Sequence, residues 1–266
     1  MAETFVRGVK LHFQRVGVEG APTKVVFLHG LVMDNLSSWY FTVANAVAAF
    51  ADVVLYDLRG HGMSDRPASG YTADDMVLDL CGVLDATVGD APVILVGNSY
   101  GAFLAVQFAL RHPARVAGLV LVDGHLGDED FGERMAGTLS LRGEEADRAI
   151  ASSFQNWLGR HSARKATRLA ALARALVGDT SLVRDLRATP PLAAEDFARI
   201  TAPALALYGE RSDLIERSAK LVGRMPRCTI HVFAGCTHSI LWEATNEVRG
   251  HIVDFCRVAG HAEVQP

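Results

Sequence analysis

Residues 93–111 read VILVGNSYGAFLAVQFALR and combine two different patterns. Val93–Val96 is a short, continuous apolar run, which is typical of a strand buried on both faces of a sheet. Residues 99–111 are apolar at helical spacing and end before His112-Pro113, where a helix is expected to stop. Gly97-Asn98-Ser99-Tyr100-Gly101 joins the two. The stretch therefore predicts a strand, a sharp turn with a serine at its apex, and a helix.

The rest of the chain repeats this alternation. Residues 9–13 alternate apolar and polar side chains, as expected for a half-buried antiparallel strand. A helix is predicted from Thr72, which can cap it, through Leu84, and another over residues 38–50. Together these patterns predict an α/β fold with a mostly parallel sheet and helices on both faces. The further strand-like runs are residues 25–28, 53–55, 119–122, 204–207 and 230–233.

One segment interrupts the alternation. From His125 to Ile200 the sequence shows no strand pattern and is rich in Ala, Leu and Arg. Because strand patterns resume at Ala204, the sheet needs sequence from both sides of this segment. We therefore expect a core built from residues 1–124 and 200–266, with a helical cap inserted over residues 125–199.

Composition excludes several classes of protein. Of 266 residues, 50% are hydrophobic and 21% charged, which excludes a disordered or coiled-coil chain. The net charge of −4 argues against a nucleic-acid partner. No apolar run reaches the roughly 18 residues that a membrane span requires, and the N-terminal residues do not resemble a signal peptide. We expect a soluble, cytoplasmic protein with no membrane association.

Neither a metal nor a cofactor is indicated. The four cysteines show no CxxC spacing and no zinc-ligand pattern, so we expect free and mostly buried thiols. No GxGxxG motif opens a helix after a strand, and there is no phosphate-binding P-loop, so no nucleotide or flavin is expected. The cysteines are Cys81, Cys228, Cys236 and Cys256.

Ser99 is the candidate nucleophile. A tight strand-to-helix turn holds the serine hydroxyl clear of the sheet, and Gly97 and Gly101 avoid Cβ atoms that would collide in such a turn. The N-terminal N–H groups of the following helix point toward the place where an oxyanion would form. We assign the two oxyanion-hole donors to the backbone N–H groups of Leu31 and Tyr100, since the loop after residues 25–28 usually supplies the second donor.

A serine needs a base, and the base needs an orienting carboxylate. His238 lies in a loop between the last predicted strand and the last helix, where its side chain can reach Ser99. Asp213 and Asp123 both follow strand ends and are both candidates for the carboxylate. We favour Asp213, because the order Ser99, Asp213, His238 matches the chain order typical of this architecture. Asp123 remains the alternative.

In these motifs the chain resembles the α/β-hydrolase superfamily. The resemblance covers about residues 1–124 and 200–260. It implies a helical cap after the sixth strand, and mainly structural roles for His29 and for the loop of residues 57–67. Haloalkane dehalogenases and epoxide hydrolases of this fold carry an aspartate at the elbow, so Ser99 makes both chemistries unexpected here. The motifs that carry the resemblance are Leu28-His29-Gly30, Asp57–Pro67, Gly97–Gly101, Tyr208–Asp213 and Gly235–His238.

The expected activity is a serine hydrolase that cleaves a carboxylic ester or thioester through an acyl-enzyme on Ser99. One alternative is a C–C bond hydrolase, or a polyketide-type lyase or cyclase, using the same three residues. Asn98 before the serine favours C–C hydrolysis, whereas Leu31–Asn35 lacks the Gly/Pro-rich stretch usual after His-Gly in those enzymes. A binding protein without catalysis is a third class, which an intact triad argues against.

Large apolar residues suggest a pocket for a lipophilic or aromatic acyl group. The same residue types are common in protein cores, which is the competing interpretation. Seven basic residues against two acidic ones between Arg160 and Arg187 suggest contact with an acyl carrier protein or with coenzyme A thioesters, although a solvated helix face gives the same pattern. The candidate pocket residues are Met33, Trp39, Leu126, Phe154, Trp157, Ile240 and Trp242.

Overall fold

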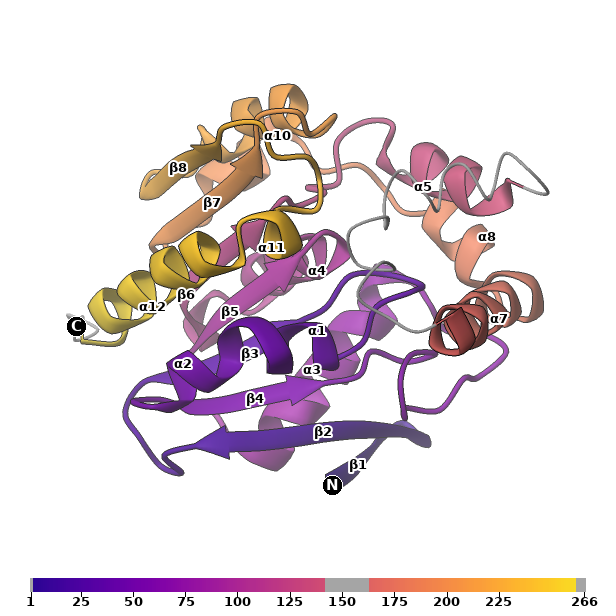
Figure 1. Cartoon of the computed structure of the whole chain (residues 1–266), viewed down its shortest axis with the longest axis horizontal. Helices are drawn as coiled ribbons and strands as arrows, with labels where there is room; N and C mark the ends of the chain where they lie inside the picture. Colours follow the sequence, from indigo (N-terminus) through magenta and orange to yellow (C-terminus); the bar gives the residue numbers. More distant parts are fainter. Residues whose placement is uncertain (1, 142–162, 262–266) are drawn as a thin grey trace.

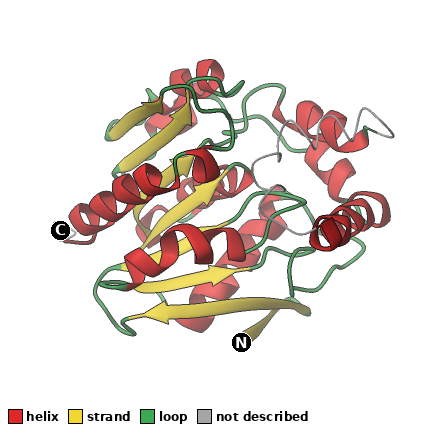
Figure 2. Ribbon diagram, viewed as in Figure 1, coloured by secondary structure: helices red, strands yellow, loops and turns green. Residues whose placement is uncertain are grey.

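The computed structural model describes residues 2–141 and 163–261. Its centre is one eight-stranded sheet in the order β1-β2-β4-β3-β5-β6-β7-β8 (Figures 1 and 2). The β1/β2 and β2/β4 pairs are antiparallel, and all later pairs are parallel. The strands are β1 (Ala2–Val6), β2 (Val9–Gly17), β3 (Lys24–Leu28), β4 (Asp52–Tyr56), β5 (Val93–Asn98), β6 (Val116–Val122), β7 (Ala204–Gly209) and β8 (Cys228–Phe233).

Helices cover both faces of this sheet (Figure 2). On one face lie α3 (Ala73–Thr87), α4 (Tyr100–Arg111) and α10 (Ile215–Val222). On the other lie α2 (Asn45–Ala48), α11 (Ile240–Glu243) and α12 (Thr245–His261). The short α1 (Ser37–Trp39) joins α2 through a π-helical segment, Tyr40–Ala44, on this second face.

The continuous apolar runs arise because successive side chains of one strand face opposite layers. In β3, Val26 and Leu28 pack in the cluster that contains α3 and α4, while Val25 and Phe27 pack in the cluster that contains α2 and α12. All four are at most 1% exposed. A strand buried on both faces needs apolar residues at every position, so the interpretation of the runs in β3, β4, β5, β6 and β7 as buried strands with parallel neighbours is confirmed. The run 230–233 also pairs in parallel, but it lies in the edge strand β8, which leaves Ile230 and Val232 exposed.

The predicted helix starts also agree with the structure. Thr72 caps α3, its hydroxyl accepting a hydrogen bond from the Asp75 N–H at 3.1 Å. Asp74 and Asp75 lie in the first turn, where negative charge is favourable at the positive end of the helix dipole. The predicted segment 99–111 corresponds to α4, with Ser99 immediately before its first residue.

Among the described residues, four helices follow β6 and precede β7, although those two strands are neighbours in the sheet. In Figure 1, α5, α7 and α8 lie beyond the carboxyl ends of the parallel strands. Phe131 of α5 stacks on Phe103 of α4 at 4.5 Å between ring centroids, which ties this group to the core. The helices are α5 (Phe131–Ser140), α7 (Ala163–Asp179), α8 (Leu182–Arg187) and α9 (Ala194–Ala198).

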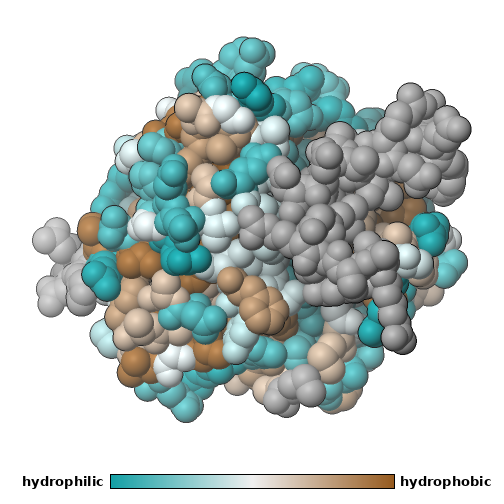
Figure 3. Space-filling model, in the orientation of Figure 1, coloured by the Kyte–Doolittle hydropathy of each residue, from teal (hydrophilic) through white to brown (hydrophobic). Residues whose placement is uncertain are grey.

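The surface is mixed in character, and the cysteines are free thiols. On the face drawn in Figure 3, hydrophobic and hydrophilic residues are interspersed, and neither kind covers it. None of the helices in the described ranges is long and apolar enough to cross a membrane. All four cysteines are free, as expected, but the expectation of burial holds only for Cys256, because the other three are partly exposed.

Candidate active site

Ser99 occupies the strained turn that its sequence predicts. Its backbone has φ 54° and ψ −113°, a region that side-chain-bearing residues rarely adopt. A Cβ atom at Gly97 would lie 2.3 Å from the Gly101 carbonyl oxygen, and one at Gly101 would lie 2.2 Å from the Leu28 carbonyl oxygen. Both glycines are therefore required by close backbone approach, and the turn carries the Ser99 hydroxyl to the carboxyl end of β5.

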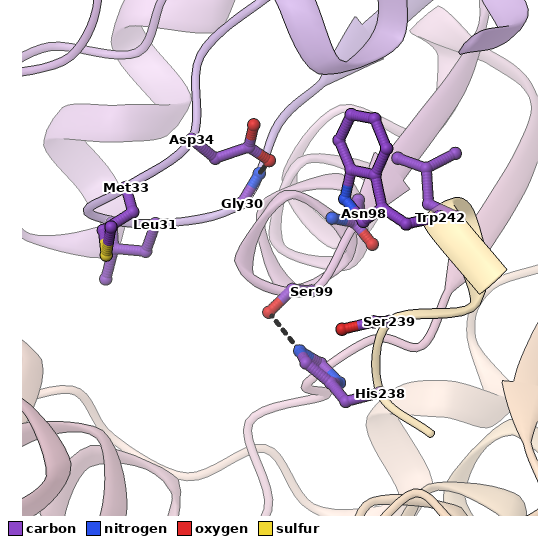
Figure 4. A pocket seen from close by; sticks show the side chains of 10 residues that line it. Gly30, Leu31, Met33, Asp34, Asn98, Ser99, His238, Ser239 and Trp242 are labelled. Carbon is purple, nitrogen blue, oxygen red and sulfur yellow. Dashed lines mark hydrogen bonds between the residues drawn. The ribbon is translucent and has the colours of Figure 1, made fainter. Parts of the chain in front are cut away.

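His238 reaches Ser99 from the loop between β8 and α11. Its Nε2 lies 3.1 Å from the Ser99 Oγ (Figure 4). The Glu243 carboxylate fixes this loop by accepting hydrogen bonds from the Thr237 N–H at 2.7 Å and the Thr237 hydroxyl at 2.8 Å. Gly209 lets the loop approach β7, because a Cβ there would lie 2.3 Å from the Thr237 carbonyl oxygen.

The carboxylate beside His238 is Asp123, whose Oδ1 lies 2.9 Å from His238 Nδ1. The prediction that Asp213 fills this position is wrong in this structure. Asp213 is exposed and lies four residues beyond the end of β7, whereas Asp123 directly follows β6 and is fully buried. Strand register explains the choice. Asn98 and Val122 are partners in the sheet, so the next residues, Ser99 and Asp123, lie on adjacent strand ends.

Asp123 is held tightly and sets the basicity of His238. It has a positive φ of 41°, a second strained residue at this edge of the sheet. Burial lowers the pKa of His238, but its hydrogen bond to Asp123 and the negative charge of that carboxylate outweigh burial, so the pKa lies above the usual 6.5. The negative charge of Asp213 also raises the pKa of His238, by less than Asp123 does. His238 is thus a stronger base than a free imidazole.

A second imidazole lies nearby but stays neutral. The ring of His125 is 5.9 Å from that of His238, and burial together with the neighbouring His238 lowers its pKa to about 3. His125 Nδ1 is buried with no hydrogen-bond partner among the described residues. His125 therefore adds no positive charge beside His238 at neutral pH.

Among the described residues, one backbone N–H group of residues 30–33 has no hydrogen-bond partner. The Gly30 N–H donates to Asp34 Oδ2 at 2.8 Å, the Val32 N–H to His61 Nε2 at 2.7 Å, and the Met33 N–H to the Leu31 carbonyl at 2.9 Å. Within the described part of the chain, the Leu31 N–H has no such partner, and neither does the Tyr100 N–H at the start of α4. These are the two groups that the sequence assigns to an oxyanion hole.

The loop of residues 57–67 supports this arrangement structurally. His61 accepts the Val32 N–H, and burial is the main cause that lowers its pKa to about 3. His29 Nε2 accepts the Leu58 N–H at 3.0 Å. Asp57 accepts the N–H groups of Leu36 and Met63, each at 2.9 Å. Every one of these side chains is at most 3% exposed, which agrees with structural and not catalytic roles.

A pocket opens at Ser99 and His238 (Figure 4). Met33 and Trp242 line it, as predicted. Trp39, Leu126 and Ile240 do not: each is at most 2% exposed and packs in the core, and the Trp39 indole N–H is bonded to the Leu28 carbonyl. Phe154 and Trp157 lie outside the described residues. The lining consists of Gly30, Leu31, Met33, Asp34, Asn98, Ser99, His238, Ser239, Leu241 and Trp242.

Sequence reasoning missed Asp34 and Ser212. Asp34 brings a carboxylate into the pocket lining, and Ser212 bonds to Asp123 from the loop after β7. Nothing in the local sequence of either residue distinguishes it from an ordinary loop position. Within the described ranges, no group of three or more His, Cys, Asp or Glu side chains is arranged to hold a metal ion.

Comparison with known proteins gives the following relations. Residues 25–249 match the model of the alpha/beta hydrolase family. A 2-hydroxy-6-oxononadienedioate/2-hydroxy-6-oxononatrienedioate hydrolase of Paraburkholderia phymatum is 31% identical over 93% of this chain and 91% of its own. A cis-3-alkyl-4-alkyloxetan-2-one decarboxylase of Shewanella oneidensis is 29% identical over 93% of this chain and 85% of its own. A thermophilic esterase from Thermogutta terrifontis shares the fold, with a TM-score of 0.81 at 20% identity over 98% of this chain and 100% of its own.

Proposed function

The chain belongs to the alpha/beta hydrolase family, and we propose that it is a serine hydrolase of carboxylic esters or thioesters with a lipophilic or aromatic acyl group. The observation that carries this proposal is the continuous relay from Ser99 Oγ to His238 Nε2 at 3.1 Å and from His238 Nδ1 to Asp123 at 2.9 Å. Such a relay activates a hydroxyl for attack on an acyl carbon.

In the proposed reaction, His238 Nε2 takes the Ser99 proton as Oγ attacks the carbonyl carbon. The N–H groups of Leu31 and Tyr100 donate to the oxyanion of the tetrahedral intermediate, and Asp123 stabilises the imidazolium. His238 then protonates the departing alcohol or thiol, leaving an acyl group on Ser99. Water, deprotonated by His238, attacks this acyl group, and collapse of the second intermediate releases the acid and restores the Ser99 hydroxyl.

The pocket favours a neutral acyl group over one that carries a second carboxylate. Leu31, Met33, Leu241 and Trp242 supply apolar lining, and Asp34 is the charged carboxylate among the described lining residues. Both Asp34 oxygens accept backbone N–H groups, from Gly30 and Asn35, each at 2.8 Å. At about 6 Å and an effective dielectric constant of about 20, repulsion between two carboxylates is about 3 kcal/mol.

This repulsion bears on the second candidate function, hydrolysis of a C–C bond. The relative from Paraburkholderia phymatum is named for dienedioate substrates, which carry two carboxylates. Asn98, directly before the nucleophile, lines the pocket and supports C–C hydrolysis or a related lyase or cyclase reaction. Asp34 argues against dicarboxylate substrates for that reaction.

A panel of substrates separates these candidates. The 4-nitrophenyl ester of hexanoate and the mono-4-nitrophenyl ester of adipate share one leaving group and acyl chain length, but only the second carries a carboxylate. We expect kcat/KM for the hexanoate ester to be higher by about tenfold or more, and Asp34→Asn to narrow that ratio. Turnover of a dienedioate diketone with no turnover of either ester would move the assignment to C–C hydrolysis.

Thioesters of coenzyme A or of an acyl carrier protein remain part of the proposal. Arg168 and Arg174 are exposed and place positive charge on the surface of α7. Arg184 and Arg187 are already paired, with Asp185 at 3.1 Å and Glu133 at 3.0 Å. If the basic residues contact an acidic carrier, kcat/KM for the carrier-bound thioester should fall steeply with salt while small-ester turnover stays constant.

A further inference from the structure

The Asp123 carboxylate accepts hydrogen bonds from other groups in addition to His238. It is fully buried, and among the described residues no Lys or Arg forms an ion pair with it. Its Oδ1 accepts the Ser212 hydroxyl at 2.5 Å as well as His238 Nδ1 at 2.9 Å, and its Oδ2 accepts the Gly209 N–H at 2.8 Å. Burying a carboxylate away from water is costly unless hydrogen-bond donors compensate for the lost hydration.

The Ser212 hydroxyl donates its one hydrogen to this carboxylate. The Ser212 oxygen accepts the Leu214 N–H at 3.2 Å, so the hydroxyl hydrogen is free to point at Asp123. Ser212 is itself 6% exposed, and its N–H is held by the Gly209 carbonyl at 3.1 Å. The loop after β7 therefore presents a fixed donor to a residue at the end of β6.

We propose that Ser212 is a positioning residue for the reaction: it holds the Asp123 carboxylate turned so that Oδ1 faces His238 Nδ1. Ser212 does not touch the substrate or the reacting atoms, and it acts through Asp123. This inference rests on the proposed function for its kinetic part, but the geometry it concerns can be measured without any substrate.

The test compares Ser212→Ala with Ser218→Ala. Ser218 is also a buried serine whose hydroxyl is bonded, to the Gly124 carbonyl at 3.2 Å, but it has no bond to the Asp123 carboxylate. On 4-nitrophenyl hexanoate, Ser212→Ala should lower kcat roughly 10- to 100-fold, the size expected when a hydrogen bond to a charged group is lost, with KM within about threefold. Ser218→Ala should keep kcat within about threefold.

Proton NMR supplies a readout that a merely structural role would not change. The His238 Nδ1 proton, bonded to a carboxylate, should give a low-field resonance in the wild-type protein. Its chemical shift should change in Ser212→Ala and not in Ser218→Ala. Ser212→Thr, which keeps the hydroxyl, should retain the wild-type resonance and most of the activity. If the alanine variant does not fold, the threonine variant is compared with the wild-type protein instead.

An unchanged resonance together with kcat within twofold of wild type in Ser212→Ala would overturn the proposal. A folded Ser212→Thr variant as slow as the alanine variant would also overturn it. If the wild-type protein turns over no ester, the proposed function fails, and the NMR comparison still decides the role of Ser212.

Discussion

At the scale of single residues, the candidate site depends on which carboxylate faces His238. Asp123 and Asp213 both follow strand ends, and chain order alone favours Asp213. The structure favours Asp123, because β6 lies next to β5 in the sheet and its last residue is the register partner of Asn98. Spacing along the sequence cannot reveal which of the two aspartates faces His238, since that depends on which strands are neighbours in the sheet and on their register.

Asp123→Asn and Asp213→Asn provide the direct comparison. Asp123→Asn should lower kcat by about 10³ to 10⁴, since an amide can neither stabilise the imidazolium nor hold the correct tautomer. Asp213→Asn should change kcat by less than about threefold. Steady-state kinetics on one ester measures both, with thermal melting to confirm folding. The reverse ranking would show that the acid is Asp213.

The pH dependence follows from the raised pKa of His238. His238 must be neutral to accept the Ser99 proton, so activity is lost as the pH falls through its pKa. Because Asp123 holds that pKa above 6.5, the acid limb of kcat/KM should lie above pH 6.5. In Asp123→Asn the residual activity should show this limb at lower pH. A limb below pH 6 in the wild-type protein would contradict this account.

At the scale of elements, the sequence predicted most of the fold. The apolar runs at residues 25–28, 53–55, 93–96, 119–122, 204–207 and 230–233 all lie in strands. The first five lie in strands covered on both faces, which leave no polar position. The last lies in the edge strand β8, where Ile230 and Val232 are 38% and 42% exposed. Individual pocket residues were predicted less well. Trp39 and Ile240 are large and apolar whether they line a pocket or fill the core, and only packing distinguishes the two.

The elbow between β5 and α4 gives an element-scale prediction. Gly101→Ala would place a Cβ 2.2 Å from the Leu28 carbonyl oxygen, so it should destabilise the protein by about 1–3 kcal/mol or more and displace Ser99. Gly137→Ala is the control. Gly137 is exposed within α5 with no atom within 4 Å of the added Cβ, and the change should stabilise by about 0.5–1 kcal/mol. Urea unfolding measures both, and equal effects would contradict the account of the elbow.

At the scale of the whole molecule, a buried ion pair links the site's supporting loop to the helical layer. Arg59, from the loop after β4, donates two hydrogen bonds to Asp79 of α3, at 2.6 and 2.5 Å, and both side chains are at most 4% exposed. The same loop carries His61, which accepts the Val32 N–H next to Leu31, whose N–H we propose as an oxyanion-hole donor. Packing against α3 thus supports the backbone that lines the pocket.

Asp79→Asn should therefore lower the free energy of unfolding by about 3–5 kcal/mol, because it leaves the Arg59 charge buried without a counter-ion. The exposed pair of Arg111 and Asp74 supplies the control, since Asp74 is 76% exposed and its replacement by Asn should cost less than about 1 kcal/mol. Free energies of unfolding from urea titration test the difference. A loss below 1 kcal/mol in Asp79→Asn would show that the buried pair adds little.

The proposed reaction passes through an acyl group on Ser99, which can be detected in the intact mass of the protein after brief mixing with 4-nitrophenyl hexanoate and an acid quench. We predict one added hexanoyl group, mapping to Ser99 by peptide mass analysis. The adduct should be absent in Ser99→Ala and form far more slowly in Asp123→Asn. Turnover of the ester without an adduct at Ser99, or an adduct that persists in Ser99→Ala, would contradict the account.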